Sequence, residues 1–196
     1  MTMNKWIVTL IATLLLVAGC EKKPFYVASI GNGGSLDGPY ILGPISVTDV
    51  LGGGGGFGYG AVNGYPGKSS SIGRMGVPKH IEGYWAKYEE GDKTTYYRIS
   101  ADIDSELAEQ KIRTLRNYYK TFKGKTGSMQ VAVERERVKI FYSRFCPSNR
   151  TDCSGKEGAD PNNWVVDSPI KGLDVVVLFD GLGEASATPF PGSPYE

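Results

Sequence analysis

Histidine and cysteine are scarce in this chain, and neither sign of charge is in excess. His80 is the one histidine among 196 residues, and the three cysteines are Cys20, Cys146 and Cys153. Hydrophobic residues make up 40% of the chain and charged residues 22%. This composition is typical of a folded domain and argues against an intrinsically disordered chain.

The charge balance bears on the class of partner. The chain has 22 basic and 21 acidic residues, and Lys5 is the one charged residue among the first 19. The remainder therefore carries 21 basic residues against 21 acidic ones. A nucleic-acid binder usually needs an overall basic surface, so we predict no nucleic-acid partner.

The scarcity of histidine leaves little for catalysis. His80 has no partner motif, since the chain holds no H-E-x-x-H zinc motif and no G-x-S-x-G nucleophile motif. Asp102 and Asp104 could act as a carboxylate pair, but they come directly before a helical pattern, where helix capping explains both. We therefore predict that the chain is not an enzyme, has no catalytic residues, and binds neither a cofactor nor a metal.

Long hydrophobic runs are also missing. The uncharged stretch at residues 6–17 has 12 residues, whereas a helix needs about 20 to cross the ~30 Å hydrocarbon core of a membrane. Lys5 before this stretch and the small residues Ala18 and Gly19 after it match the parts of a secretory signal peptide. The pattern predicts export, with residues 1–19 as the signal peptide.

The cysteine after these small residues adds a second prediction. Residues 16–20, Leu-Val-Ala-Gly-Cys, resemble a bacterial lipobox, whose cysteine receives a diacylglycerol anchor. The resemblance implies lipidation with palmitate at Cys20, a lipid-anchored tether over residues 20–30, and a membrane as partner. An ordinary signal peptide with an incidental cysteine is the alternative. Because Glu21 is not aspartate, the sorting rule of Gram-negative bacteria predicts a periplasm-facing position on the outer membrane; the inner membrane stays open as the alternative.

If Cys20 carries lipid, Cys146 and Cys153 remain as a pair. Disulfides form outside the cytoplasm, and the turn-rich residues 147–152 let the chain bend back between the two cysteines. A zinc site is the alternative, but two cysteines without a nearby histidine fall short of four ligands. We predict a disulfide.

Glycine dominates residues 31–76. Residues 41–51 alternate as a strand does, whereas residues 52–60 are mostly glycine, and we predict an irregular loop there of the kind that often contacts partners. This loop matches G-x-G-x-x-G, but no helical pattern follows, so a phosphate-binding turn is not expected. Tyr59 and Tyr65 in this region are candidate partner-binding residues.

The middle of the chain predicts a hairpin and then a helix. Residues 81–88 and 93–101 are rich in Tyr, Trp, Thr and Ile and flank a four-residue turn, which places Tyr88 at the hairpin end as a third candidate for partner binding. Residues 104–123 carry an apolar stripe at helical spacing. Basic residues cover the outer face of this helix, which suits an acidic partner, lipid headgroups or simple solvation. They are Lys111, Arg113, Arg116, Lys120 and Lys123.

The last third predicts further strands. The alternation at residues 129–133 changes phase before residues 138–142, so a turn or a bulge must lie at 134–137. Residues 173–179 form the most hydrophobic strand, with a turn expected at 180–183. We predict an α+β fold in which residues 31–190 form one domain, mainly an antiparallel sheet with one packed amphipathic helix. Residues 191–196 are expected to be a flexible tail.

Several of these features together resemble a known family. The lipobox, the glycine-rich residues 52–60, residues 78–85 and the strand at 175–179 are similar to a family of proteobacterial lipoproteins of unknown function. Members are often found beside type VI secretion effectors, including phospholipases, and some look like immunity proteins. The resemblance implies a lipoprotein that binds a secreted toxin and blocks its active site. A structural or assembly lipoprotein of the outer membrane is one alternative, and a ligand-binding or enzymatic lipoprotein is another.

Overall fold

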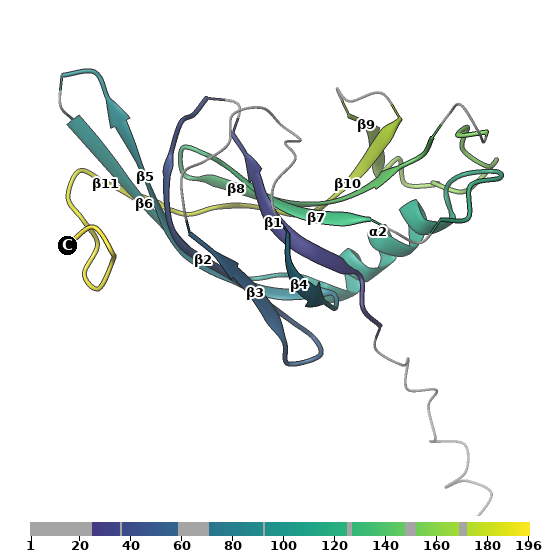
Figure 1. Ribbon diagram of the computed structural model, residues 1–196, viewed down its shortest axis with the longest axis horizontal. Coiled ribbons are helices and arrows are strands. Elements are labelled where there is room, and N and C mark those ends of the chain that lie inside the picture. The colour runs from purple at the N-terminus through teal and green to yellow at the C-terminus, as the bar shows by residue number, and fades with distance from the viewer. Residues whose placement is uncertain are drawn as a thin grey trace, which may run out of the picture.

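The computed structural model describes residues 25–35, 37–58, 71–91, 93–124, 127–147, 152–168 and 172–196. The predicted signal peptide, Cys20, Tyr59 and Tyr65 lie outside these ranges. The described residues form eleven strands and one helix, which confirms the predicted α+β class (Figure 1). Within these ranges, no helix is long and apolar enough to cross a membrane.

The first sheet has six strands in the order β4-β1-β7-β8-β10-β9. Neighbours pair antiparallel, except that β1 and β7 are parallel. The bounds are Ala28–Gly34 for β1, Ser71–Met75 for β4, Ser128–Glu134 for β7, Arg137–Phe145 for β8, Val165–Asp167 for β9 and Leu173–Leu182 for β10.

The second sheet has five antiparallel strands in the order β11-β6-β5-β2-β3. The bounds are Ile41–Asp49 for β2, Gly54–Phe57 for β3, Pro78–Glu89 for β5, Lys93–Asp102 for β6 and Glu184–Ser186 for β11. Strands β5 and β6 form the predicted hairpin, with Glu89 opposite Lys93 next to the turn.

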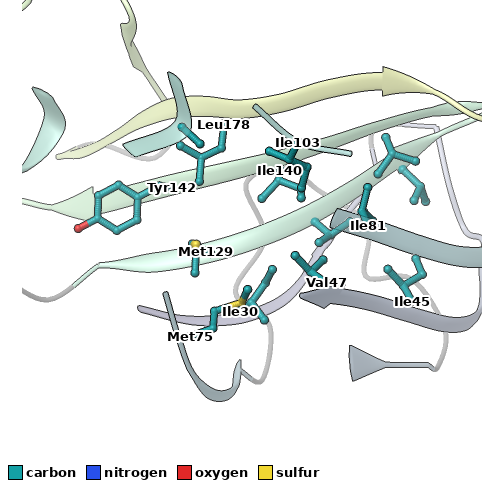
Figure 2. Close-up of a cluster of buried hydrophobic side chains, with 14 of the residues drawn as sticks. Ile30, Ile45, Val47, Met75, Ile81, Ile103, Met129, Ile140, Tyr142 and Leu178 are labelled. Carbon is teal, nitrogen blue, oxygen red and sulfur yellow. The ribbon is translucent and has the colours of Figure 1, made fainter. Parts of the chain in front are cut away.

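One hydrophobic core joins the two sheets. Figure 2 shows Ile140 and Leu178 of the first sheet gathered with Val47 and Ile81 of the second. Helix α2 (Ser105–Asn117) packs on β10 and β8, and its buried residues join the same core. In the second sheet, the hairpin of β5 and β6 therefore has one face fixed by packing against this core.

Helix α2 begins as predicted but ends early. Asp104 caps the first turn, since its carboxylate accepts a hydrogen bond from Leu107 N at 2.9 Å. The helix ends at Asn117 and not at residue 123. The reason is tertiary: Tyr119 leaves the helix and forms a β-bridge with Gly155, in the loop that follows the disulfide.

The basic outer face predicted for this helix is only partly exposed. Lys111 Nζ donates to Val177 O at 2.7 Å, and burial lowers the pKa of its amine. Arg113 is exposed, but it pairs with Glu109 Oε1 at 2.6 Å, four residues earlier in the helix. Of the predicted basic residues, Lys120 and Lys123, which follow the end of the helix, are exposed to solvent.

The glycine-rich region is not wholly a loop. Gly54–Phe57 forms β3, which pairs with β2 from Ile45 to Thr48. The turn between these strands is organised by Asp49, a buried residue whose carboxylate accepts hydrogen bonds from three backbone N–H groups. These hydrogen bonds fix the turn that leads into β3, a strand whose glycines have no side chains that could hold it by packing.

The two ends of the predicted domain also differ from expectation. The tether predicted at 20–30 cannot extend through residue 30, because β1 begins at Ala28 and Val27 N donates to Met75 O. Strand β10 continues through the turn predicted at 180–183 and pairs with β8 as far as Leu182. After Gly183 the chain passes directly to the other sheet as β11.

The ambiguous residues 134–137 form a turn. Glu134 pairs with Arg137, so β7 and β8 are two strands of a tight hairpin, and Arg135 has a positive φ of 52°. Arg135 is fixed from both sides by the other sheet. Its N–H donates to Tyr40 Oη at 2.7 Å, and its carbonyl accepts from Trp85 Nε1 at 2.7 Å.

Candidate functional site

The outer face of the five-stranded sheet carries the candidate site. On β5 the core residues Ile81 and Trp85 alternate with side chains that point away from the core, as period-two geometry requires. The register then places His80 opposite Asp102 and Tyr84 opposite Arg98 on the same face. We call this surface the outer face; its β5 and β6 members are His80, Glu82, Tyr84, Tyr88, Tyr96, Arg98, Ser100 and Asp102.

A hydrogen-bonded chain of three side chains lies at one end of the outer face. His80 Nδ1 is 2.8 Å from Asp102 Oδ1, and His80 Nε2 is 3.4 Å from Ser100 Oγ. No sequence motif gives His80 a partner; the register of β5 and β6 supplies one, because it places Asp102 opposite His80. The interpretation of Asp102 as a helix cap is wrong, since it is Asp104 that accepts the capping bond.

The order carboxylate, imidazole, hydroxyl is that of a hydrolase triad, but its setting differs. The side chain of Asp102 is 93% exposed, so water surrounds the group that would have to orient the imidazole. Hydrolytic triads work in sites that exclude water and stabilise an oxyanion. In so open a setting, the three groups are suited to hydrogen bonding with a partner.

A groove lies next to this chain of side chains. Its volume is about 460 Å³, and β2, β5, β6 and β11 contribute to its walls. The polar and aromatic lining residues are Ser46, Glu82, Tyr84, Arg98, Ser100 and Glu184. Arg98 Nη2 forms an ion pair with Glu184 Oε2 at 2.9 Å, which ties β6 to the edge strand β11. The groove thus presents both signs of charge around a tyrosine.

The C-terminal segment bounds the outer face at its other end. Arg98 lies over the ring of Phe190, with 4.6 Å between the guanidinium carbon and the ring centroid. Tyr195 Oη donates to Ile41 O at 2.7 Å, and its ring contacts that of Tyr96. Burial raises the pKa of Tyr195 to about 12. The prediction of a flexible tail at 191–196 is therefore wrong: the segment is packed on the sheet.

The predicted partner-binding residues fare differently from one another. Tyr88 is 69% exposed and lies on the outer face, on the same strand as Tyr84. Tyr59 and Tyr65 fall outside the described residues. Sequence reasoning missed Tyr84 and Arg98, although the alternation along β5 and β6 was a signal that could have placed them beside Tyr88.

The predicted disulfide is confirmed: Cys146 and Cys153 are bonded to each other. Cys146 is buried at the end of β8, and the bond holds the following loop against the segment after α2. Among the residues that the structure describes, no three His, Cys, Asp or Glu side chains gather as a candidate metal site.

Comparisons with other proteins add no identification. No family model matches this chain, no curated protein is similar to it, and no solved structure matches it. Function must therefore be inferred from the outer face and from the sequence features at the beginning of the chain.

Proposed function

We propose that this chain is a bacterial envelope lipoprotein, anchored through Cys20, that acts by binding a protein. The finer proposal is that the partner is a secreted toxin and that binding neutralises it on the periplasmic side of the outer membrane. The observation that carries the proposal is the outer face, where an exposed tyrosine, Tyr88, and the groove around Tyr84 and Arg98 share one sheet surface.

The composition of the outer face supports protein binding. Tyrosine and arginine are enriched among the residues that dominate binding energy at protein interfaces, because they combine large contact area with hydrogen bonding. Tyr84, Tyr88 and Tyr96 lie on one hairpin with Arg98, and the core holds the other face of that hairpin. A surface held in this way loses little conformational entropy when a partner binds.

The beginning of the chain supports the location and the mode of action. A lipid at Cys20 would confine the domain to the membrane surface. Because a toxin that acts on the envelope must reach this surface, the anchor would raise the local concentration of the inhibitor where the toxin acts. An inhibitor needs a rigid contact surface and no chemistry of its own. The resemblance to lipoproteins encoded beside type VI effectors agrees with this role.

The proposal is tested with any secreted lipase or amidase whose gene lies beside the gene for this chain, taken as the candidate effector. Binding of the purified effector is measured by calorimetry for the wild type, for Tyr88→Ala with Arg98→Ala, and for Tyr26→Ala as a matched control. Tyr26 is also an exposed tyrosine, 58% accessible, but it lies outside the outer face. Truncation of two interface anchors weakens binding by about 2 to 4 kcal/mol, or roughly 30- to 1000-fold, whereas the control binds as the wild type does.

The cellular test separates the proposal from its alternative. A strain that lacks the gene should be killed by sibling cells that deliver the effector, and the wild type and Tyr26→Ala should restore survival. If deletion causes leaky membranes without sibling killing, the chain is an assembly lipoprotein and the toxin proposal is wrong. If all variants bind the effector as tightly as the wild type does, the outer face is not the binding interface.

A further inference from the structure

A basic hollow lies at the end of helix α2, lined by none of the residues that line the groove. Its volume is about 420 Å³, and the helix end, the segment after it and the loop after the disulfide all contribute to it. The charged and aromatic lining residues are Arg116, Tyr119, Lys120, Phe122, Lys123 and Lys156. No carboxylate is among the described residues that line it.

The lysines of the hollow are available to a ligand. Lys120, Lys123 and Lys156 are exposed, and none of them forms an ion pair within the described part of the chain. The carboxylate of Asp152 interacts with the charge of Lys120. Hydrogen bonds from Ser154 are the main cause that lowers the pKa of Asp152, and the positive charge of Lys120 lowers it slightly further. The hollow therefore carries an excess of positive charge, although Lys120 and Lys156 also border Glu157 and Asp160 in the neighbouring hollow.

A buried arginine removes the main obstacle to anion binding at this place. The carbonyl groups at a helix C-terminus carry partial negative charge, which repels an anion. Arg144, 1% exposed, donates from Nη1 to Leu115 O at 2.9 Å and to Arg116 O at 2.8 Å. It also contacts the rings of Tyr119 and Phe122, which line the hollow. The helix end is thus neutralised from within.

The disulfide loop completes the hollow by bringing in Lys156. Lys156 N donates to Tyr118 O at 2.8 Å, and Lys120 N donates to Ser154 O at 3.0 Å. These two backbone bonds hold the loop after Cys153 against the segment that follows the helix. Lysines that are distant in sequence come together because of this pairing.

The hollow is next to the place where the chain would leave for its lipid anchor. Arg116 Nη2 donates to Val27 O at 2.8 Å, and its guanidinium carbon is 4.9 Å from the centroid of the Phe25 ring. Four residues lie between Cys20 and Phe25, so the five steps of chain that join them span at most about 18 Å. A domain of this size has a radius of gyration of about 16 Å. So short a connection would keep the hollow on the side that faces the bilayer.

We propose that this basic hollow docks on the headgroups of anionic phospholipids and so orients the domain on the membrane. Charge complementarity favours a phospholipid surface. The β5–β6 hairpin end lies at the opposite end of the molecule from α2 (Figure 1), so Tyr88 would project away from the bilayer. This orientation rests on the proposed lipid anchor, whereas the docking of the hollow on anionic headgroups does not.

The test uses residues 21–196, which contain every described strand, the helix and the whole core. Cosedimentation is measured with vesicles of phosphatidylcholine alone and with vesicles in which about a third of the lipid is phosphatidylglycerol. The variant Lys120→Gln with Lys123→Gln is compared with Lys79→Gln with Lys93→Gln. The second pair is also exposed and removes the same charge, but it lies on β5 and β6. Thermal unfolding checks that all chains are folded.

The expected result is binding to the anionic vesicles only, weakened by added salt. Each lysine near an anionic surface contributes about fivefold in affinity, so the pair Lys120 and Lys123 should cost about 30-fold and the control pair little. Equal binding to both vesicle types, or equal losses in both variants, would overturn the proposal. Competition by millimolar inorganic phosphate would instead identify a site for a small free anion. Because neither Cys20 nor the toxin takes part, this test can fail independently of the proposed function.

Discussion

Replacing Asp49 by alanine removes one carboxylate that accepts hydrogen bonds from three N–H groups on two separate stretches of backbone. The carboxylate accepts from Leu51 N and Gly53 N at 2.8 Å each, and from Gly76 N at 2.6 Å. These hydrogen bonds join the turn between β2 and β3 to the segment after β4. In Asp49→Ala all three N–H groups lose their partner at once.

The magnitude follows from the burial of the three donors. A buried N–H without an acceptor costs about 1 to 3 kcal/mol. The bond to Gly76 is buried and should contribute about 2 kcal/mol, whereas the other two are partly buried, can turn to water, and should contribute about 1 kcal/mol each. The free energy of unfolding should therefore fall by about 4 kcal/mol, which lowers Tm by about 8 to 16 °C in a domain of this size.

The assay is urea unfolding followed by tryptophan fluorescence and by circular dichroism. Asp104→Ala is the control, since it also removes an acidic acceptor but loses only the exposed capping bond to Leu107 N, which costs about 1 kcal/mol. Asp49→Asn keeps one carbonyl oxygen and should fall between the two. If Asp49→Ala is as stable as Asp104→Ala, the carboxylate does not organise the turn and the explanation of β3 is wrong.

Three further predictions concern stability. Hydrogen bonds from Arg137 lower the pKa of Asp180 below its ordinary 3.8. The stability that this pair contributes is therefore present above pH 3.8 and is lost as the pH falls through the lower pKa of the folded state. In urea titrations, Asp180→Asn should have a lower free energy of unfolding than the wild type at pH 7, and this difference should shrink below about pH 4. Cys153→Ser opens a short loop and should lower the free energy of unfolding by about 2 kcal/mol, and the wild type with reductant should match it in thermal melts. In Gly83→Ala the new Cβ would lie 2.7 Å from Ile45 Cγ1. Overpacking of this kind should lower Tm by several degrees. An unchanged Tm would show that β2 can move aside.

Local patterns predicted the elements whose formation depends on neighbours in sequence. The β5–β6 hairpin was predictable because its alternation and its turn lie within one short segment, and the structure gives that pairing. The start of the helix was predictable because Asp104 caps a turn only three residues away. The disulfide was predictable because a turn-rich loop brings Cys146 and Cys153 together.

Patterns failed where a distant segment competed with a local preference. The apolar stripe continues beyond Asn117, but pairing of Tyr119 with Gly155 ends the helix there. Residues 191–196 have the composition of a loose end, yet Tyr195 finds an acceptor at Ile41, which is far away in sequence. Neither partner is visible from within the segment itself.

The amino-acid sequence by itself determined the class of fold, the central hairpin, the beginning of the helix and the cysteine pair, because each depends on periodicity or on contacts within a few residues. Only the tertiary structure decided which side chains share a surface. Sheet register placed His80 against Asp102, and the pairing of two distant loops placed Lys156 beside Lys120. The physical reason is that a strand pattern specifies which residues face outward but not which strand lies next to it.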